Sequence, residues 1–195
     1  MSITVGFASE ILKNVKFDDG RPKASDWTHH FNLVKPMPMK LENFIEHFLY
    51  QLNLDEELLV HAFGIVESAL EELTSLNVHR IVLTALAISY KFCIDCPATN
   101  SQIEKVGGLK PGELLTLETV LLDVCQWKIH QLDYTERKNS LIKIGEEELT
   151  CRKEVHDEDN EDNEDYEDLV NLDDSDTTGC ETNESFSELS AFFTF

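Results

Sequence analysis

The chain has 195 residues, a formal net charge of −22 and a hydrophobic share of 42%. This length is enough for one well-buried domain and too short for two generous ones. The acidic balance argues against nucleic-acid binding, because phosphate contacts require a basic face and the sequence contains no basic run.

The first 38 residues have a mixed composition and are interpreted as an N-terminal extension. We expect one short helix here, capped by Ser9 and ending near Val15. Pro36 and Pro38 then close the segment, because proline does not continue a regular helix or strand.

Two amphipathic helices are predicted next, since apolar residues recur at helical spacing. The first begins near Leu41, and the second begins at Asp55 as its N-cap. Glu56 and Glu57 would then lie in the first turn, where the helix dipole favours acidic side chains. The apolar faces consist of Leu41, Phe44, Ile45, Phe48, Leu49 and Leu52 in the first helix, and of Leu59, Ala62, Phe63, Val66, Ala69, Leu70 and Leu73 in the second.

The third predicted helix spans Val78 to Cys93, with Asn77 as its N-cap. It is apolar over most of its circumference, so we expect it at the centre of the core. No part of the sequence has the alternation of a strand. The predicted fold is therefore all-α, a compact bundle of about five helices with flanking segments.

A short fourth helix is expected after a loop around Pro97, with a capping box at its start and glycines at its end. A fifth helix is expected from Pro111, at its first position, to Trp127, and a weaker sixth over residues 133–148. The capping box is either Thr99 with Gln102 or Ser101 with Glu104, and the terminal glycines are Gly107 and Gly108.

The end of the chain is strongly acidic. Residues 1–145 carry 19 acidic and 14 basic side chains, whereas residues 146–195 carry 19 acidic and two basic ones. Such a self-repelling stretch cannot offset its ordering entropy by burial, so we predict that it is disordered. The predicted division is an extension over 1–38, a helical domain over 39–132, a flanking helix over 133–153 and an acidic tail over 154–195.

Two charged residues interrupt the most apolar helices. Glu118 lies three residues after Leu115 and four before Leu122, and Lys91 follows Ala87 by four residues. An isolated buried charge is costly unless it is paired and hydrogen-bonded. The two charges therefore form an internal pair, or a polar hot spot facing a partner, or they simply point to solvent at helix edges. Their spacing alone leaves these alternatives open.

The segment Ser75–Phe92, SLNVHRIVLTALAISYKF, is followed by the KVGG of Lys105–Gly108 and by the E-L-x-x-L-E run of Glu113–Glu118. Together these motifs closely resemble the cyclin box of the P/U-type cyclins, the phosphate-signalling branch. The resemblance extends more faintly upstream to Leu41 and downstream to Ile129. It implies that residues 39–132 form a single cyclin box.

The resemblance also implies a function. Cyclins are regulatory subunits that bind a cyclin-dependent protein kinase and hold its regulatory helix in the active position, while catalysis belongs to the kinase. In the family, the central polar contacts come from positions that correspond to Lys91 and Glu118. Where the family usually has an Asp-Arg dipeptide in its second helix, this chain has Glu67-Ser68. The apolar rim carried over consists of Phe92, Leu122, Trp127 and Ile129.

Other functions find less support. Cys93 and Cys96 form a CxxC pair, but a zinc site would need two further ligands, and a redox pair is expected at a helix N-terminus rather than a C-terminal end. We expect no catalytic residue, metal or cofactor. The sequence shows no secretory signal or membrane span, which favours an intracellular protein of the cytoplasm or nucleus. The competing interpretation is a non-catalytic adaptor or chaperone-like protein that holds basic partners with its acidic tail.

Overall fold

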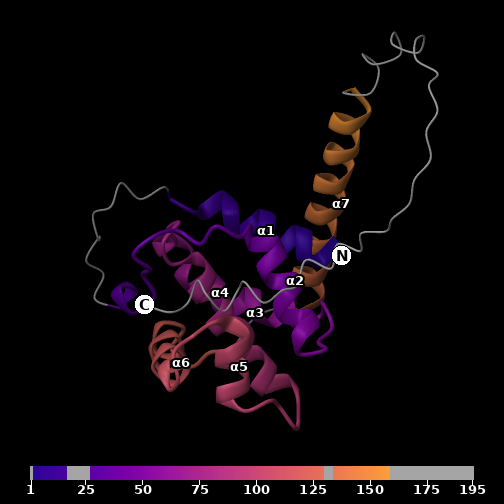
Figure 1. Cartoon of the computed structure of the whole chain (residues 1–195). Helices are drawn as coiled ribbons and strands as arrows, with labels where there is room; N and C mark the ends of the chain where they lie inside the picture. The colour runs from indigo at the N-terminus through magenta and orange to yellow at the C-terminus, as the bar shows by residue number, and fades with distance from the viewer. Residues whose placement is uncertain (1, 17–26, 130–133, 159–195) are drawn as a thin grey trace, which may run out of the picture.

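The computed structural model describes residues 2–16, 27–129 and 134–158, and these are all-helical, as predicted (Figure 1). Among them the backbone forms no strand beyond one isolated bridge between Lys16 and Thr74. No described helix has the length and apolar content needed to cross a membrane. The predicted acidic tail lies outside the described residues from 159 onward. The elements are α1 (Ser2–Asn14), η1 (Thr28–His30), α2 (Leu41–Gln51), α3 (Leu58–Val66), η2 (Glu67–Glu72), α4 (Val78–Cys93), α5 (Asn100–Gly107), α6 (Glu113–Val124) and α7 (Tyr134–Glu158).

Helix α4 runs through the middle of the body, with α5 and α6 at one end and α1 and α7 at the other (Figure 1). Every residue from Ile81 to Tyr90 is buried, which confirms the central place predicted for this helix. Its buried hydroxyl at Thr84 donates a hydrogen bond to Arg80 O, 2.7 Å away. This hydroxyl is therefore satisfied within the helix itself although solvent does not reach it, whereas the buried Ser89 Oγ of the same helix has no hydrogen-bond partner among the described residues.

The NVHR motif at the start of α4 ties neighbouring segments to this helix. Asn77 occupies the N-cap position, but its side chain does not cap α4. Its Oδ1 instead accepts from Thr74 N, and its Nδ2 donates to Glu72 O. The neighbouring His79 Nε2 lies 2.9 Å from Met39 O. These residues fix the segments that precede α4 and α2, so their role is structural.

Three predicted helix starts, at Ser9, Asp55 and Pro111, are wrong. Ser9 lies inside α1, which begins at Ser2 because its residues from Ile3 to Ala8 are buried by packing that the local sequence does not reveal. Helix α3 begins at Leu58 rather than after Asp55. The intervening residues form a turn instead, in which the backbone carbonyl of Asp55 accepts from Leu58 N.

The start of α6 also differs from the expectation. Pro111 precedes the helix, and Gly112 occupies the N-cap with a φ of +81°. The Glu113 carboxylate reaches back to accept from Lys110 N at 2.9 Å, and its other oxygen pairs with Arg80 on α4. A glycine supplies this left-handed backbone at little steric cost, so the helix starts two residues after the proline.

The ends of α5 agree with the predicted chemistry. Thr99 Oγ1 accepts from Gln102 N while Gln102 Oε1 accepts from Thr99 N, which selects this capping box over the alternative pair. Gly108 closes the helix with a φ of +65°. At Gly107 a Cβ would lie 2.5 Å from a Leu83 methyl, so this glycine lets α5 approach α4 closely.

Helix α7 packs along α1 and then extends past the body (Figure 1). The helix expected over 133–148 is much longer, since it reaches Glu158 and includes the boundary drawn at residue 153. Its outer part is joined to α2 by Arg152, whose guanidinium donates to both carboxylate oxygens of Glu42 at 3.1 and 2.9 Å.

Candidate functional site

Lys91 in the last turn of α4 and Glu118 in the middle of α6 form an ion pair. Lys91 Nζ lies 2.6 Å from Glu118 Oε1 and 2.7 Å from Oε2. The Glu118 side chain is only 8% exposed, whereas that of Lys91 is 27% exposed. The charges are therefore paired with each other, and the alternative in which Glu118 points to solvent is wrong. A carboxylate so deeply buried requires this partner.

Apolar side chains lie within four residues of this pair along α4 and α6, among them Phe92, Leu115 and Leu122. Phe92, next to Lys91, is exposed. On α6, Leu122 lies one turn after Glu118 and is partly buried, and Leu115 lies one turn before it and is exposed. Leu115 was not among the predicted site residues, although its spacing of three from Glu118 places it on the same helix face.

The segment after α6 carries the last two predicted residues. Trp127 is 63% exposed, and its indole Nε1–H donates to Asp123 Oδ1 at 2.9 Å. Its backbone, like that of Gln126, has a positive φ. Ile129 differs from Trp127, because it is partly buried and packs against the core. In the structure, Lys91 therefore pairs with Glu118, Phe92 and Trp127 are exposed, and Ile129 packs against the core.

The CxxC pair follows Lys91 and Phe92 directly in the sequence. Cys93 and Cys96 are both exposed, and both have free thiols. Partial burial raises the pKa of the Cys93 thiol, which disfavours the reactive thiolate. In the described part of the chain, no group of three or more His, Cys, Asp or Glu residues could hold a metal ion.

The family model for cyclins matches residues 39–129, which include α2 to α6 and the segment that carries Trp127. The match includes the Lys91–Glu118 pair. Residues 39–129 are a cyclin domain. The curated relatives of this segment include cyclins named P2-1 and U2-1, in agreement with the P/U-type resemblance of the sequence motifs. Helices α1 and α7 lie outside the match.

Three curated relatives illustrate the similarity. Cyclin-P2-1 of Oryza sativa subsp. japonica is 29% identical over 98 residues, which cover 48% of this chain and 45% of the relative. PHO85 cyclin-7 of Saccharomyces cerevisiae is 40% identical over 53 residues, or 27% and 19% of the two chains. Cyclin-U2-1 of Arabidopsis thaliana is 39% identical over 54 residues, or 28% and 24%. The matched part thus spans less than half the length of each relative.

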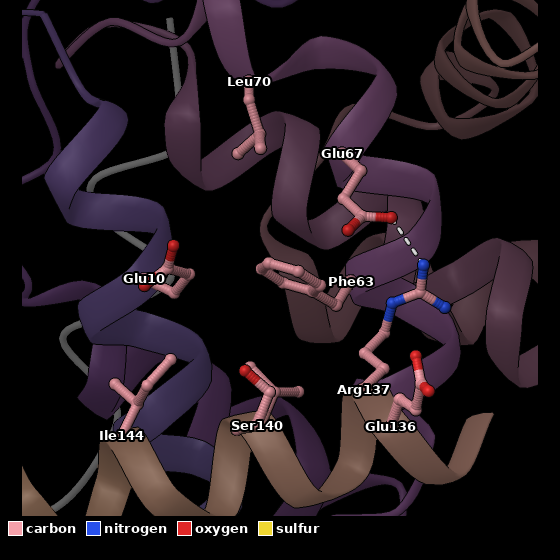
Figure 2. A pocket seen from close by; sticks show the side chains of 9 residues that line it. Glu10, Phe63, Glu67, Leu70, Glu136, Arg137, Ser140 and Ile144 are labelled. Atoms are coloured by element: carbon pink, nitrogen blue, oxygen red, sulfur yellow. Dashed lines mark hydrogen bonds and ion pairs between the residues drawn. The ribbon is translucent and has the colours of Figure 1, made fainter. Parts of the chain in front are cut away.

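Helix α7 lies outside the match but forms an ion pair with the matched segment at Glu67. Glu67 pairs with Arg137 of α7, with 2.5 Å between Arg137 Nη2 and Glu67 Oε2 (Figure 2). Its neighbour in the sequence is Ser68, and the guanidinium that pairs with Glu67 therefore comes from a different helix. The pair borders a cavity of about 500 Å³ between α1, α3 and α7, into which the Phe63 ring points (Figure 2).

Proposed function

We propose that this protein is a cyclin that binds a cyclin-dependent protein kinase and controls its activity or substrate choice. The kinase contacts the outer face of α4 and α6, and the catalytic residues belong to the kinase rather than to this chain. The protein would therefore act inside the cell, in the cytoplasm or nucleus, where such kinases work. The proposed binding residues are Lys91, Phe92, Glu118, Leu122, Trp127 and the partly buried Ile129, and we add the exposed Leu115; we call these seven residues the docking surface.

The observation that carries this proposal is the Lys91–Glu118 ion pair at the border between core and solvent. A carboxylate that is 8% exposed and already paired keeps acceptor capacity for a partner's backbone N–H groups, while the more exposed Lys91 keeps donor capacity. Exposed apolar side chains at Phe92, Leu115 and Trp127 would exclude water around the pair once a partner is bound. Interfaces concentrate their binding energy in such partly desolvated centres with apolar rims.

The proposal is tested by affinity purification with mass spectrometry, comparing wild type with the Lys91→Ala/Glu118→Ala variant. We expect one cyclin-dependent kinase to be captured by wild type and lost from the variant. A matched control is Glu10→Ala/Lys13→Ala, which removes an exposed ion pair of 3.0 Å from α1, away from the docking surface. Capture of the same kinase by all three chains would contradict the proposed surface. Circular dichroism of each variant separates lost binding from lost folding.

A second purification distinguishes the proposal from an adaptor that holds basic partners through its acidic tail. The chain is truncated after Glu158, so that all of α7 is retained. A cyclin should still capture its kinase after this truncation, because the docking surface is intact. If the captured proteins are basic and disappear with the tail, the adaptor interpretation is correct instead.

A further inference from the structure

The turn after α6 places two consecutive residues other than glycine in the left-handed region of backbone space. The φ angle is +54° at Gln126 and +59° at Trp127. Residues with a Cβ adopt this conformation rarely, because the Cβ crowds the backbone. Such positions persist where neighbouring interactions determine them, and they are concentrated at binding and active sites. The interactions that stabilise this turn can therefore indicate its function.

Hydrogen bonds to the last turn of α6 hold the segment. Trp127 N donates to Leu122 O at 2.8 Å, and Gln126 N donates to Asp123 O at 3.0 Å. These two bonds are the pair that defines a Schellman helix end, with Gln126 at the position where glycine is usual. A side-chain bond is added to them, from the Trp127 indole Nε1 to Asp123 Oδ1 at 2.9 Å. Asp123 thus supports the turn with its carbonyl and its carboxylate.

The side chain that this turn orients is displayed rather than buried. Trp127 is 63% exposed even with its indole bonded to Asp123. The backbone bond to Leu122 joins Trp127 to the last turn of α6, and Leu122 itself lies one turn after Glu118 on that helix. Ordering a large side chain on binding costs affinity, and that cost falls when the side chain already holds its bound orientation. An exposed, oriented tryptophan therefore has the properties of a preorganised interface anchor.

We propose that Asp123 is a positioning residue for the docking surface, and that its carboxylate and the left-handed turn hold the Trp127 indole in the docking orientation before the kinase binds. This inference rests on the proposed function. It predicts that the indole N–H is protected in the free chain, and that the effect of Asp123 on kinase affinity acts through Trp127 alone. A residue with a merely structural role would affect affinity whether or not the indole N–H is present.

The first test uses the free full-length chain and ¹⁵N NMR of the two indole groups, with the Trp127 signal assigned by its loss in Trp127→Phe. Asp123→Leu removes the acceptor, and Asp123→Asn keeps an acceptor oxygen while it removes the charge. We expect the Trp127 N–H to exchange with water several-fold faster in Asp123→Leu and to remain close to wild type in Asp123→Asn. Equal exchange in wild type and Asp123→Leu would overturn the proposal.

The second test measures the affinity of the captured kinase for the same variants. We expect Asp123→Leu to weaken binding roughly three- to tenfold, which is the effect of one side chain losing its preorganisation. Asp123→Asn should restore most of the affinity. In the Trp127→Phe background, Asp123→Leu should cause no further loss, because the indole N–H is already absent. An equal loss in both backgrounds would overturn the positioning role.

The two tests separate failure of this inference from failure of the proposed function. If Asp123→Leu frees the indole but kinase affinity is unchanged, the inference is wrong while the kinase-binding function stands. If wild type captures no kinase at all, the proposed function fails and the binding consequence of Asp123 fails with it. The exchange rates measured without kinase then still decide whether Asp123 orients the indole.

Discussion

Gly6 of α1 and Gly145 of α7 lie against each other's helix in a reciprocal arrangement. A Cβ on Gly6 would overlap the backbone carbonyl of Leu141 and lie 3.0 Å from Gly145 N. A Cβ on Gly145 would overlap the carbonyl of Ser2 and lie 3.1 Å from Gly6 N. The two helices outside the matched cyclin domain are therefore joined backbone to backbone, at a distance that only glycine permits.

This arrangement predicts that Gly6→Ala or Gly145→Ala separates α1 from α7. The overlap is with backbone atoms, which cannot rotate away, so we expect a loss of about 3 kcal/mol or more in the free energy of unfolding. Gly64→Ala is the control, because its Cβ would meet the flexible guanidinium of Arg137 at 3.1 Å. Urea denaturation followed by circular dichroism measures all three. Similar small losses for all three would argue against the close approach.

Removing one partner of the Lys91–Glu118 pair should lower the stability more than replacing both partners by apolar residues. Lys91→Ala leaves a carboxylate that is 8% exposed without its cation, and we expect the free energy of unfolding to fall by about 1–3 kcal/mol. Lys91→Met/Glu118→Leu should recover most of that loss, because well-packed apolar side chains need no charge partner. If the apolar double variant is less stable than Lys91→Ala, the pair contributes more to the fold than this account allows.

The Arg137–Glu67 pair should stabilise the junction between η2 and α7. The Arg137 side chain is 10% exposed and that of its partner Glu67 is 36% exposed, so the pair is partly screened by solvent. We expect Arg137→Ala to cost about 1–2 kcal/mol, through the lost bond and the lost packing of the stem. Lys143→Ala is the control, because its pair with Glu147 spans 3.9 Å between exposed side chains and should contribute almost nothing. Thermal denaturation compares the two variants.

Because of His79, we expect the stability of the fold to decrease at acidic pH. Burial lowers the pKa of His79 from its ordinary value of 6.5, against a smaller opposing effect of its hydrogen bond to Met39. The unfolded chain therefore binds a proton more readily than the folded chain below pH 6.5, and stability falls as the pH drops through that value toward the folded pKa. The slope contributed by one group is at most about 1.4 kcal/mol per pH unit.

Comparing wild type with His79→Gln isolates this contribution, because the other titrating groups are shared. The free energy of unfolding, measured from pH 7.5 down to 5, should fall less steeply in His79→Gln than in wild type. Partial burial also lowers the pKa of His47, so some slope should remain in the variant. Parallel curves for the two chains would show that His79 is not the source.

Features with a local physical cause could be predicted from the sequence. The nearly continuous apolar character of residues 78–93 determines the central position of α4, and Thr99, Gln102 and Gly108 carry the capping chemistry of α5 within their own few residues. The motif positions also located the Lys91–Glu118 pair. The sequence could not show that the pair is internal, because this depends on how α4 and α6 pack.

Features that depend on contacts between distant parts of the chain could not be predicted, because they also arise from helix packing. The full length of α1 requires burial against α7, and the partner of Glu67 lies 70 residues away at Arg137. The left-handed turn at Gln126 and Trp127 has no local signal, because neither residue type favours a positive φ. These contacts arise from the tertiary arrangement, which hydrophobic periodicity does not encode.

The most direct test of the central claim is the dissociation constant of the captured kinase for wild type, Glu118→Gln and Thr116→Ala. Thr116 is exposed on α6 but lies two residues from Glu118, on another side of the helix. We predict that Glu118→Gln weakens binding by roughly tenfold or more, as expected for a central interface residue, and that Thr116→Ala leaves it unchanged. Equal affinity of the kinase for all three chains would contradict the claim that it binds at the Lys91–Glu118 pair.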